Sequence, residues 1–313
     1  MAKKIRVVAS LTTMPDRYFK TVKTLHTLNK QTYKFDAIYL SLPEKSKRLG
    51  IEYPPITEEM SQLCTVVHCE DYGPITKIVG GLLSEDDPET VIISFDDDMI
   101  YPNTLVETLM QHHKKYPNSA LGSSGMLLKY SCPMCAITPN EDNFLFRIPK
   151  FPVPPEGRRV DSIYGYPGAL YVRKFFPIKD QLETKFLKYA LEERNMFIND
   201  DITISGYLSL KGVERRIFPN MPIVSFVLDE ESGTRLRNKN EISYDLDTFF
   251  QRMNAAITSS KKIGMYSQTE DVNFTETIAG VTAIVVLCVL AVILICIYLF
   301  KNNLLTNWSS YLL

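Results

Sequence analysis

The sequence predicts one α/β domain, built on a mainly parallel sheet flanked by helices, with a single transmembrane helix near the C-terminus. The domain is indicated by short runs rich in β-branched residues, and by the segments of helical periodicity that alternate with them. This order is typical of a parallel sheet covered by helices. The membrane helix is indicated by 23 consecutive residues that include no charged residue, proline or amide.

The expected strands lie mainly in the first third of the chain, with helices between or after several of them. The strand-like runs are residues 5–11, 37–42, 63–68 and 91–95. In the helix expected after the fourth run, Pro102 suits a first-turn position, and Leu105, Leu109, His112 and Tyr116 follow at spacings of three and four. The later expected elements are a strand within 168–176, a helix near 180–194 and a helix within 199–210.

The composition, 45% hydrophobic and 23% charged, is that of an ordinary folded protein. The 35 basic residues against 36 acidic ones give a net charge of -1, and no long basic stripe occurs, so we expect no nucleic-acid partner. The CPMC sequence at 132–135 has the spacing of a zinc or redox site. A lone pair of this kind is a weak signal, and we expect the cysteines to be structural thiols.

The apolar segment at 278–300 sets the expected domain boundaries. At ~1.5 Å per residue its length covers the roughly 30 Å hydrocarbon core of a bilayer. The alternative is a buried core helix, which rarely needs apolar residues on every face for so long. We therefore expect a folded domain at 1–260, a mostly polar linker at 261–277, the membrane helix and a short tail at 301–313.

The N-terminal sequence bears on the compartment of the folded domain. Residues 1–15 begin with basic side chains, but the apolar stretch that follows is short and is interrupted by Arg6. This pattern suits a first strand better than a signal peptide. We therefore expect a single-pass protein held by a C-terminal tail anchor, with its folded domain in the cytosol. The lysines at 261, 262 and 301 agree with this orientation only weakly.

Three adjacent acids, Asp96, Asp97 and Asp98, end the strand expected at 91–95. Open α/β sheets bind ligands at the carboxyl ends of their strands. If the extended geometry continues, Asp96 and Asp98 share one side and Asp97 faces the other. Carboxylates this close repel one another unless a cation lies among them, so the motif predicts a Mn²⁺ or Mg²⁺ site shared with substrate phosphates. The alternative is a solvated turn that caps the next helix.

Six segments occur along the chain in this order: ASLTTMPDR, YLSLP, EDYGPITK, VIISFDDDMIYP, GYPGALYVRKFF and NDDITISGYL. In that order and spacing they resemble the GT-A-fold nucleotide-sugar glycosyltransferases of large algal DNA viruses and bacterial polysaccharide clusters. The resemblance spans residues 5–225. It implies a Rossmann-like GT-A fold and a metal-dependent DxD motif. It also implies transfer of a sugar from a nucleotide diphosphate donor, with a lean to UDP, to a glycan or other hydroxyl acceptor.

The resemblance assigns two groups of residues to the donor. Thr12, Thr13 and Arg17 would line the pocket for base, ribose and phosphate, although Arg17 also suits a solvent-facing place in a first helical turn. Asp71 and Lys77 would approach the nucleotide diphosphate, where a lysine supplies a compact positive charge. An ordinary surface lysine is the alternative for Lys77.

Within the acid triplet, the resemblance makes Asp96 and Asp98 the metal ligands and places Asp96 and Asp97 on the donor side. The metal of this family is sometimes completed by a late histidine. This chain has no histidine after residue 113, so water and the donor diphosphate would supply the remaining ligands.

The GYPGALY segment is the expected wall for the sugar or the acceptor. Gly165 and Gly168 permit a close backbone approach, and Tyr164 and Tyr166 offer amphipathic faces. The two glycines also suit a simple turn. The segment therefore leaves both interpretations open.

The acids of NDDITIS, Asp200 and Asp201, lie just before an expected helix. An acceptor hydroxyl needs a base within hydrogen-bond reach as it attacks the anomeric carbon. By resemblance to inverting members, Asp201 is the expected base, and Asp200 is its neighbour or orients the acceptor. Helix capping alone is the alternative.

These expectations combine into a membrane-tethered, metal-dependent glycosyltransferase that works with inversion. A nucleotidyltransferase is one alternative, but residues 5–20 contain no glycine for a phosphate-binding loop. The other is a non-catalytic tethered scaffold of the same fold. The retained acids at 96, 98 and 201 argue against that scaffold, because unpaired acids are costly to keep.

Overall fold

The computed structural model describes residues 4–128, 136–137, 153–227 and 246–267, all within a folded unit that runs from Met1 to Thr269. Within these ranges, no helix has both the length and the apolar character that crossing a bilayer requires. The apolar segment expected to cross the membrane, 278–300, lies outside the described residues.

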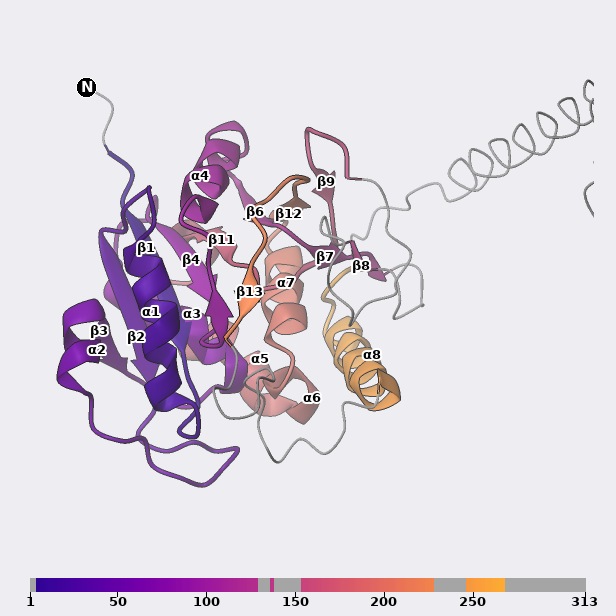
Figure 1. Cartoon of the computed structure of the whole chain (residues 1–313). Coiled ribbons are helices and arrows are strands. Elements are labelled where there is room, and N and C mark those ends of the chain that lie inside the picture. Colours follow the sequence, from indigo (N-terminus) through magenta and orange to yellow (C-terminus); the bar gives the residue numbers. More distant parts are fainter. Residues whose placement is uncertain (1–3, 129–135, 138–152, 228–245, 268–313) are drawn as a thin grey trace, which may run out of the picture. The chain divides into compact units, whose positions relative to one another are not determined.

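A mixed, mainly parallel sheet of eight strands forms the centre of the fold (Figure 1). Its order is β3-β2-β1-β4-β11-β6-β12-β9. The pairs β3–β2, β2–β1, β1–β4 and β6–β12 are parallel, and β11 runs antiparallel to β4 and β6. The strand bounds are β1 Val7–Thr12, β2 Ala37–Leu42, β3 Thr65–His68, β4 Val91–Phe95, β6 Ser119–Gly122, β9 Arg158–Arg159, β11 Ala169–Val172 and β12 Glu214–Ile217.

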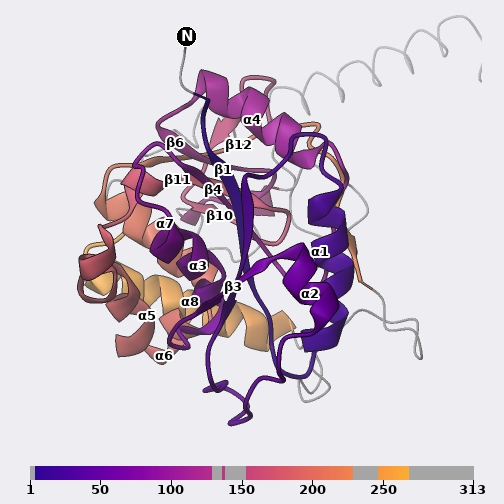
Figure 2. The ribbon, with the colours of Figure 1, turned by 90° about the vertical axis from the view of Figure 1, so that its left-hand side faces the viewer.

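Helices cover both faces of this sheet, as the alternation of strands and helices predicts. In Figure 2, α1 and α2 lie on one side of the strands and α3 on the other. The helix bounds are α1 Thr21–Asn29, α2 Glu58–Leu63, α3 Thr76–Ser84, α4 Leu105–Lys115, α5 Lys188–Glu192, α6 Arg194–Phe197, α7 Asp200–Leu210 and α8 Leu246–Lys262. Short 3-10 turns occur at Tyr18–Lys20, Gly73–Ile75, Arg173–Phe175 and Lys179–Gln181, and one π turn at Glu183–Leu187.

Strand β1 shows why the sheet needs both layers. Val7 and Leu11 pack in the core layer that contains α1 and α4, whereas Val8 packs in the layer that contains α3. Successive side chains of a strand point to opposite faces, so a run that is buried throughout must be covered twice. Helix α3 lies close to the sheet because its Gly80 and Gly81 amides donate to strand hydroxyls, at 2.8 and 3.1 Å.

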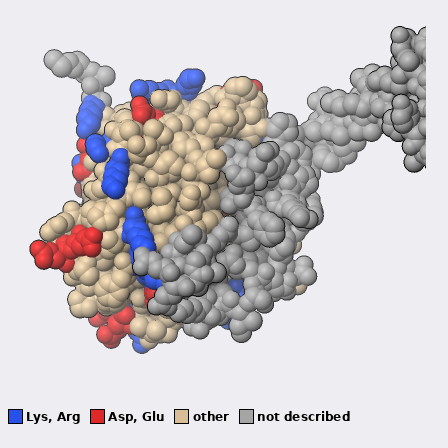
Figure 3. Space-filling view, in the orientation of Figure 1, with Lys and Arg blue, Asp and Glu red and all other residues tan. Residues whose placement is uncertain are grey.

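Two small sheets complete the described fold. Strands β7, Gly125–Met126, β8, Ala136–Ile137, and β10, Ser162–Ile163, form a three-stranded sheet. Strand β5, Met99–Ile100, pairs with β13, Ser225–Phe226, just after the acid triplet. On the coloured part of the face in Figure 3, several basic side chains lie along a line from the upper left toward the middle, and much of the remaining coloured surface is uncharged.

Several boundaries differ from those expected. The single helix expected near 180–194 is divided among a 3-10 turn, a π turn, α5 and the start of α6. Helix α4 begins at Leu105 because the Pro102 carbonyl accepts the Leu105 amide at 3.1 Å in a preceding turn, so Pro102 lies outside the helix. At the other end of the chain, α8 includes residues 261–262, and Met265 and Tyr266 are buried in the folded unit. The first residues of the segment expected as a linker therefore pack as part of the fold.

Candidate functional site

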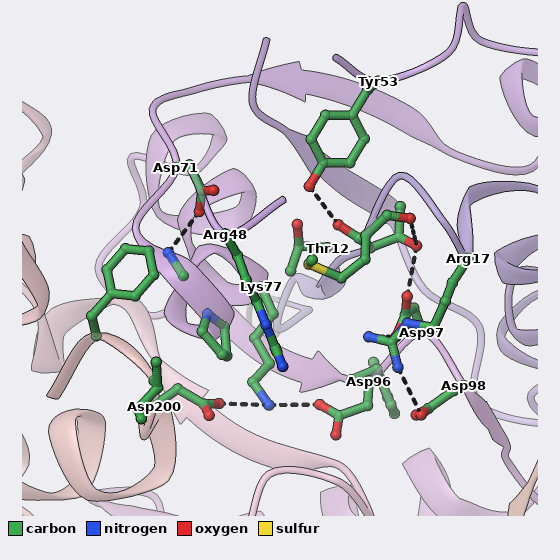
Figure 4. Close-up of a pocket in the computed structure, with 17 residues that line it drawn as sticks. Thr12, Arg17, Arg48, Tyr53, Asp71, Lys77, Asp96, Asp97, Asp98 and Asp200 are labelled. Carbon is green, nitrogen blue, oxygen red and sulfur yellow. Dashed lines mark hydrogen bonds and ion pairs between the residues drawn. The ribbon is translucent and has the colours of Figure 1, made fainter. Parts of the chain in front are cut away.

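A cavity of about 270 Å³ lies at the carboxyl ends of β1 and β4 (Figure 4). These two strands are parallel neighbours, so the segments that follow them meet at one edge of the sheet. The start of α3, the loop after β2 and the start of α7 close the remaining sides. Nine of the residues expected at the site line this cavity: Thr12, Thr13, Arg17, Asp71, Lys77, Asp96, Asp97, Asp98 and Asp200.

The acid triplet does not continue the strand. A turn at residues 97–98 follows β4, and Asp97 and Asp98 both reach Arg17, whose guanidinium nitrogens lie 3.0 Å from a carboxylate oxygen of each. The expected division, with Asp97 opposite the other two acids, is therefore wrong. The turn has a tertiary cause, because Thr24 donates to the Asp97 carbonyl at 2.8 Å and the Asp98 carbonyl accepts the Val227 amide at 2.7 Å.

Asp97 is the buried member of the triplet and is held on two sides. Thr13 donates to it at 2.6 Å, and Thr21 in turn donates to Thr13 at 2.7 Å. Burial raises the pKa of Asp97, while Arg17 opposes that shift. Burial and the nearby Asp97 raise the pKa of Asp98 to about 7. Burial alone would lower the pKa of Arg17, but these carboxylates raise it, so Arg17 stays charged.

Lys77 connects the strand acids to the helix acids. Its ammonium lies 2.6 Å from Asp96 and 2.7 Å from Asp200, and its side chain is only 6% exposed (Figure 4). Burial alone would lower the pKa of Lys77, but Asp200 and Asp96 raise it well above its usual value. The surface-lysine interpretation is therefore wrong, since the lysine is a buried counter-ion inside the site.

The acid pair occupies the first turn of α7 and does not cap it. The cap position is Asn199, whose side chain makes no capping bond. Asp201 instead accepts the Gly165 amide, from another segment, at 2.8 Å. Burial, followed by Asp200, raises the pKa of Asp201 well above its usual range. Asp200 lines the cavity, whereas Asp201 lies behind it beside Gly165 and Lys77.

The GYPGALY segment divides between the site and the core. A Cβ on Gly165 would lie 2.8 Å from the Lys77 ammonium and 3.0 Å from Asp201, so this glycine makes room for both. Gly168 has φ +92° and donates its amide to Gly165 in a turn. Tyr164 is buried in the core, and Tyr166 packs against both core layers while its carbonyl accepts the Tyr101 hydroxyl.

Asp71 organises the cavity wall through the backbone. Its two carboxylate oxygens accept the Lys47 and Gly73 amides, each at 2.7 Å. These bonds tie the loop after β2 to the turn before α3. In that loop the structure adds two lining residues that the sequence analysis missed, Arg48 and Tyr53. The usable signal was their place after a parallel strand, at the same sheet edge as the acids.

The side chains that line the cavity could supply only some of the ligands of a bound metal ion. The described residues include no group of three histidine, cysteine or acidic side chains that could hold a metal ion. Asp96 and Asp98 line the cavity with side chains 31% and 19% exposed. Mg²⁺ and Mn²⁺ prefer oxygen ligands, and Mg²⁺ commonly takes one or two carboxylates together with substrate phosphates. The residues present therefore fit an ion whose coordination a phosphate ligand completes.

Comparisons with known proteins identify no family for this chain. No protein-family model matches the chain, and no curated protein gives a significant match. Among solved structures, the chain is similar to the crystal structure of S. aureus TarS 1-349, with a TM-score of 0.41 and 10% sequence identity. The match covers 71% of this chain and 60% of that chain. We assign no activity from this likeness.

Proposed function

We propose that this chain is a metal-dependent GT-A glycosyltransferase that moves a sugar from a nucleotide diphosphate donor to a hydroxyl acceptor. One observation carries the proposal. Lys77 pairs with both Asp96 and Asp200, so the strand acids and Asp200 of α7 border one cavity although they lie far apart in the chain. A site for a metal-bound diphosphate and a separate site for a general base are the two parts that this reaction needs.

The donor would lie along the ends of β1 and β4. Arg17, Arg48 and Lys77 bring positive charge to the cavity, which suits the diphosphate. Tyr53 lines the same cavity, and its hydroxyl donates to the Thr13 carbonyl at 2.8 Å, so its ring is fixed at the wall. This ring is a suitable support for the base of the donor, for which we favour UDP.

Asp96 and Asp98 would hold Mn²⁺ or Mg²⁺ when donor is bound. The ion would neutralise charge on the leaving diphosphate. The chain itself contributes Lys77, whose ammonium can balance the same charge from the α3 side. No covalent glycosyl intermediate is required if an acid of α7 deprotonates the acceptor hydroxyl and the acceptor oxygen attacks the anomeric carbon directly. A single displacement of this kind inverts the configuration at that carbon.

Asp201 is the proposed base. Burial, followed by Asp200, raises its pKa, and a higher pKa makes a carboxylate a stronger proton acceptor. Asp200 is paired with the Lys77 ammonium at 2.7 Å. The acceptor would approach from the cavity that Asp200 lines, while the Gly165 amide holds the Asp201 carboxylate. We also propose that residues 278–300 anchor the protein in a membrane, with the enzyme domain in the cytosol.

The test is a panel of nucleotide sugars with the full chain in detergent, with Mn²⁺ or with EDTA, measuring released nucleoside diphosphate. We expect Mn²⁺-dependent release from at least one UDP-sugar and loss of release in Asp98→Asn. Asp86→Asn is the matched control, because Asp86 forms an ion pair with Lys179 and its side chain is 81% exposed. Metal-dependent release of pyrophosphate from a nucleoside triphosphate would indicate a nucleotidyltransferase. No turnover and no binding of UDP would indicate the scaffold.

A further inference from the structure

The first turn of α7 is held by elements other than its own cap residue. Ser162 donates to the Asp201 carbonyl at 3.0 Å, and the Tyr266 hydroxyl donates to the Ile202 carbonyl at 2.6 Å. Tyr266 follows α8, a helix that contacts α7 and α6 (Figure 1). A residue from the end of the folded unit therefore bonds to the helical turn that carries the acid pair.

The surface of α7 is shaped to admit the Tyr266 ring. A Cβ on Gly206 would lie 2.6 Å from the Met265 sulfur and 3.1 Å from Cε2 of Tyr266. The Tyr266 amide donates to Ser209 at 2.7 Å, near the C-terminal end of the same helix. The aromatic residue is thus bonded to α7 at Ile202 and at Ser209, and the intervening glycine provides the space.

The backbone at Tyr266 is held in an unfavourable conformation. Its φ is +61°, a left-handed value that is uncommon for a residue with a side chain, and the residue is 3% exposed. Such a conformation is energetically disfavoured and persists where surrounding contacts fix it. The buried contacts of Tyr266 with α7 therefore offset the cost of its backbone conformation. This indicates that the position of Tyr266 against α7 matters to the fold.

We propose that Tyr266 is a positioning residue, which fixes the first turn of α7 and thereby the carboxylate of Asp201. This inference rests on the proposed function for its catalytic consequence. The structural part of the inference does not depend on that function. Asp201 accepts the Gly165 amide, so hydrogen exchange at that amide reports on the position of Asp201 without any turnover.

The experiment compares Tyr266→Phe with the unchanged full chain by amide hydrogen exchange and by kinetics. The variant keeps the ring and removes only the hydroxyl. We expect exchange about fivefold faster in the first turn of α7 and at the Gly165 amide, the size of one lost hydrogen bond. With the UDP-sugar that the unchanged chain uses, we expect kcat to fall by a similar factor while the donor KM stays unchanged.

Tyr207→Phe is the matched control. Tyr207 lies on the same helix and is 1% exposed, and its hydroxyl has no hydrogen-bond partner among the described residues. It should alter neither readout. If Tyr266→Phe does not fold, Gly206→Ala displaces the same ring and should give the same two changes.

Unchanged exchange at Gly165 in Tyr266→Phe would overturn the inference, and so would faster exchange with unchanged kcat. Faster exchange at Gly165 in a chain that turns over no UDP-sugar would support the positioning and count against the proposed function instead. The two ideas therefore fail by different results.

Discussion

The Lys77 ammonium lies 2.6 Å from the Asp96 carboxylate, and this ion pair joins helix α3 to the end of strand β4. The same ammonium reaches Asp200 at the start of α7. A buried charge is stable only when it is paired, so the lysine and the two acids depend on one another. Substitution of any one of these three residues should therefore change the measured stability of the domain.

Lys77→Met should destabilise the domain. Removal of one partner of a buried ion pair typically costs about 3–5 kcal/mol, and the partial exposure of Asp96 places our expectation near 3 kcal/mol. Urea unfolding of the two proteins measures the difference. Lys174→Met is the control, because Lys174 pairs with Glu89, whose side chain is 63% exposed, and its loss should cost less than about 1 kcal/mol. Equal losses in the two variants would contradict a buried counter-ion role.

Asp97→Asn should act mainly on stability. Asp97 is buried between Arg17 and Thr13, so the substitution leaves the partly buried Arg17 guanidinium with one carboxylate fewer, at a cost of about 3 kcal/mol. Thermal and urea unfolding should show this loss, while the folded fraction should still bind Mn²⁺ with UDP. A protein of unchanged stability that has lost Mn²⁺ binding would show that Asp97 is a metal ligand instead.

Substitution of Asp201 should mainly lower activity, whereas substitution of Asp200 should lower stability. Asp201→Asn should lower kcat by about 10²–10⁴-fold, the usual contribution of a general base, with little change in donor KM. Its stability should be kept or raised, since burial already disfavours the charged form of Asp201. Asp200→Asn should be the less stable variant, because it removes a partner of Lys77. Full activity in Asp201→Asn would transfer the base assignment away from Asp201.

His113 should make the domain sensitive to mild acid. It is buried, its Nδ1 has no partner among the described residues, and burial, with Lys174, lowers its pKa below 6.5. Below pH 6.5 the unfolded chain binds a proton at His113 that the folded chain does not. The free energy of unfolding therefore decreases as the pH is lowered, by up to about 1.4 kcal/mol per pH unit.

His113→Leu isolates this effect, because all other titrating groups are common to both proteins. Urea unfolding at pH 7.5 and 5.5 should show a smaller acid loss in the variant than in the unchanged chain. The raised pKa values of Asp97 and Asp98 act in the opposite sense, favouring stability at lower pH, and they cancel in the comparison. An equal acid loss in both proteins would exclude His113 as the cause.

The sequence by itself determined the strands β1 to β4 and where the acids fall along the chain, but it did not indicate β6 or β12. Runs at 37–42 and 91–95 match β2 and β4, because burial on both faces requires apolar, β-branched residues at consecutive positions. The same pattern placed the acid triplet at a strand end, and the sheet-edge rule then indicated a ligand site there. These features depend on neighbouring residues and on the spacing of apolar residues, and both can be read from a single sequence.

Only the tertiary structure decided which groups meet. The turn at 97–98 exists because α1 and the segment at 227 bind its carbonyls, and that turn gives Arg17 two carboxylates. The pairing of Lys77 with both acid groups, and the bond from Tyr266 to α7, join segments that no spacing rule relates. Such contacts depend on how helices pack on the sheet, and packing is set by many side chains together.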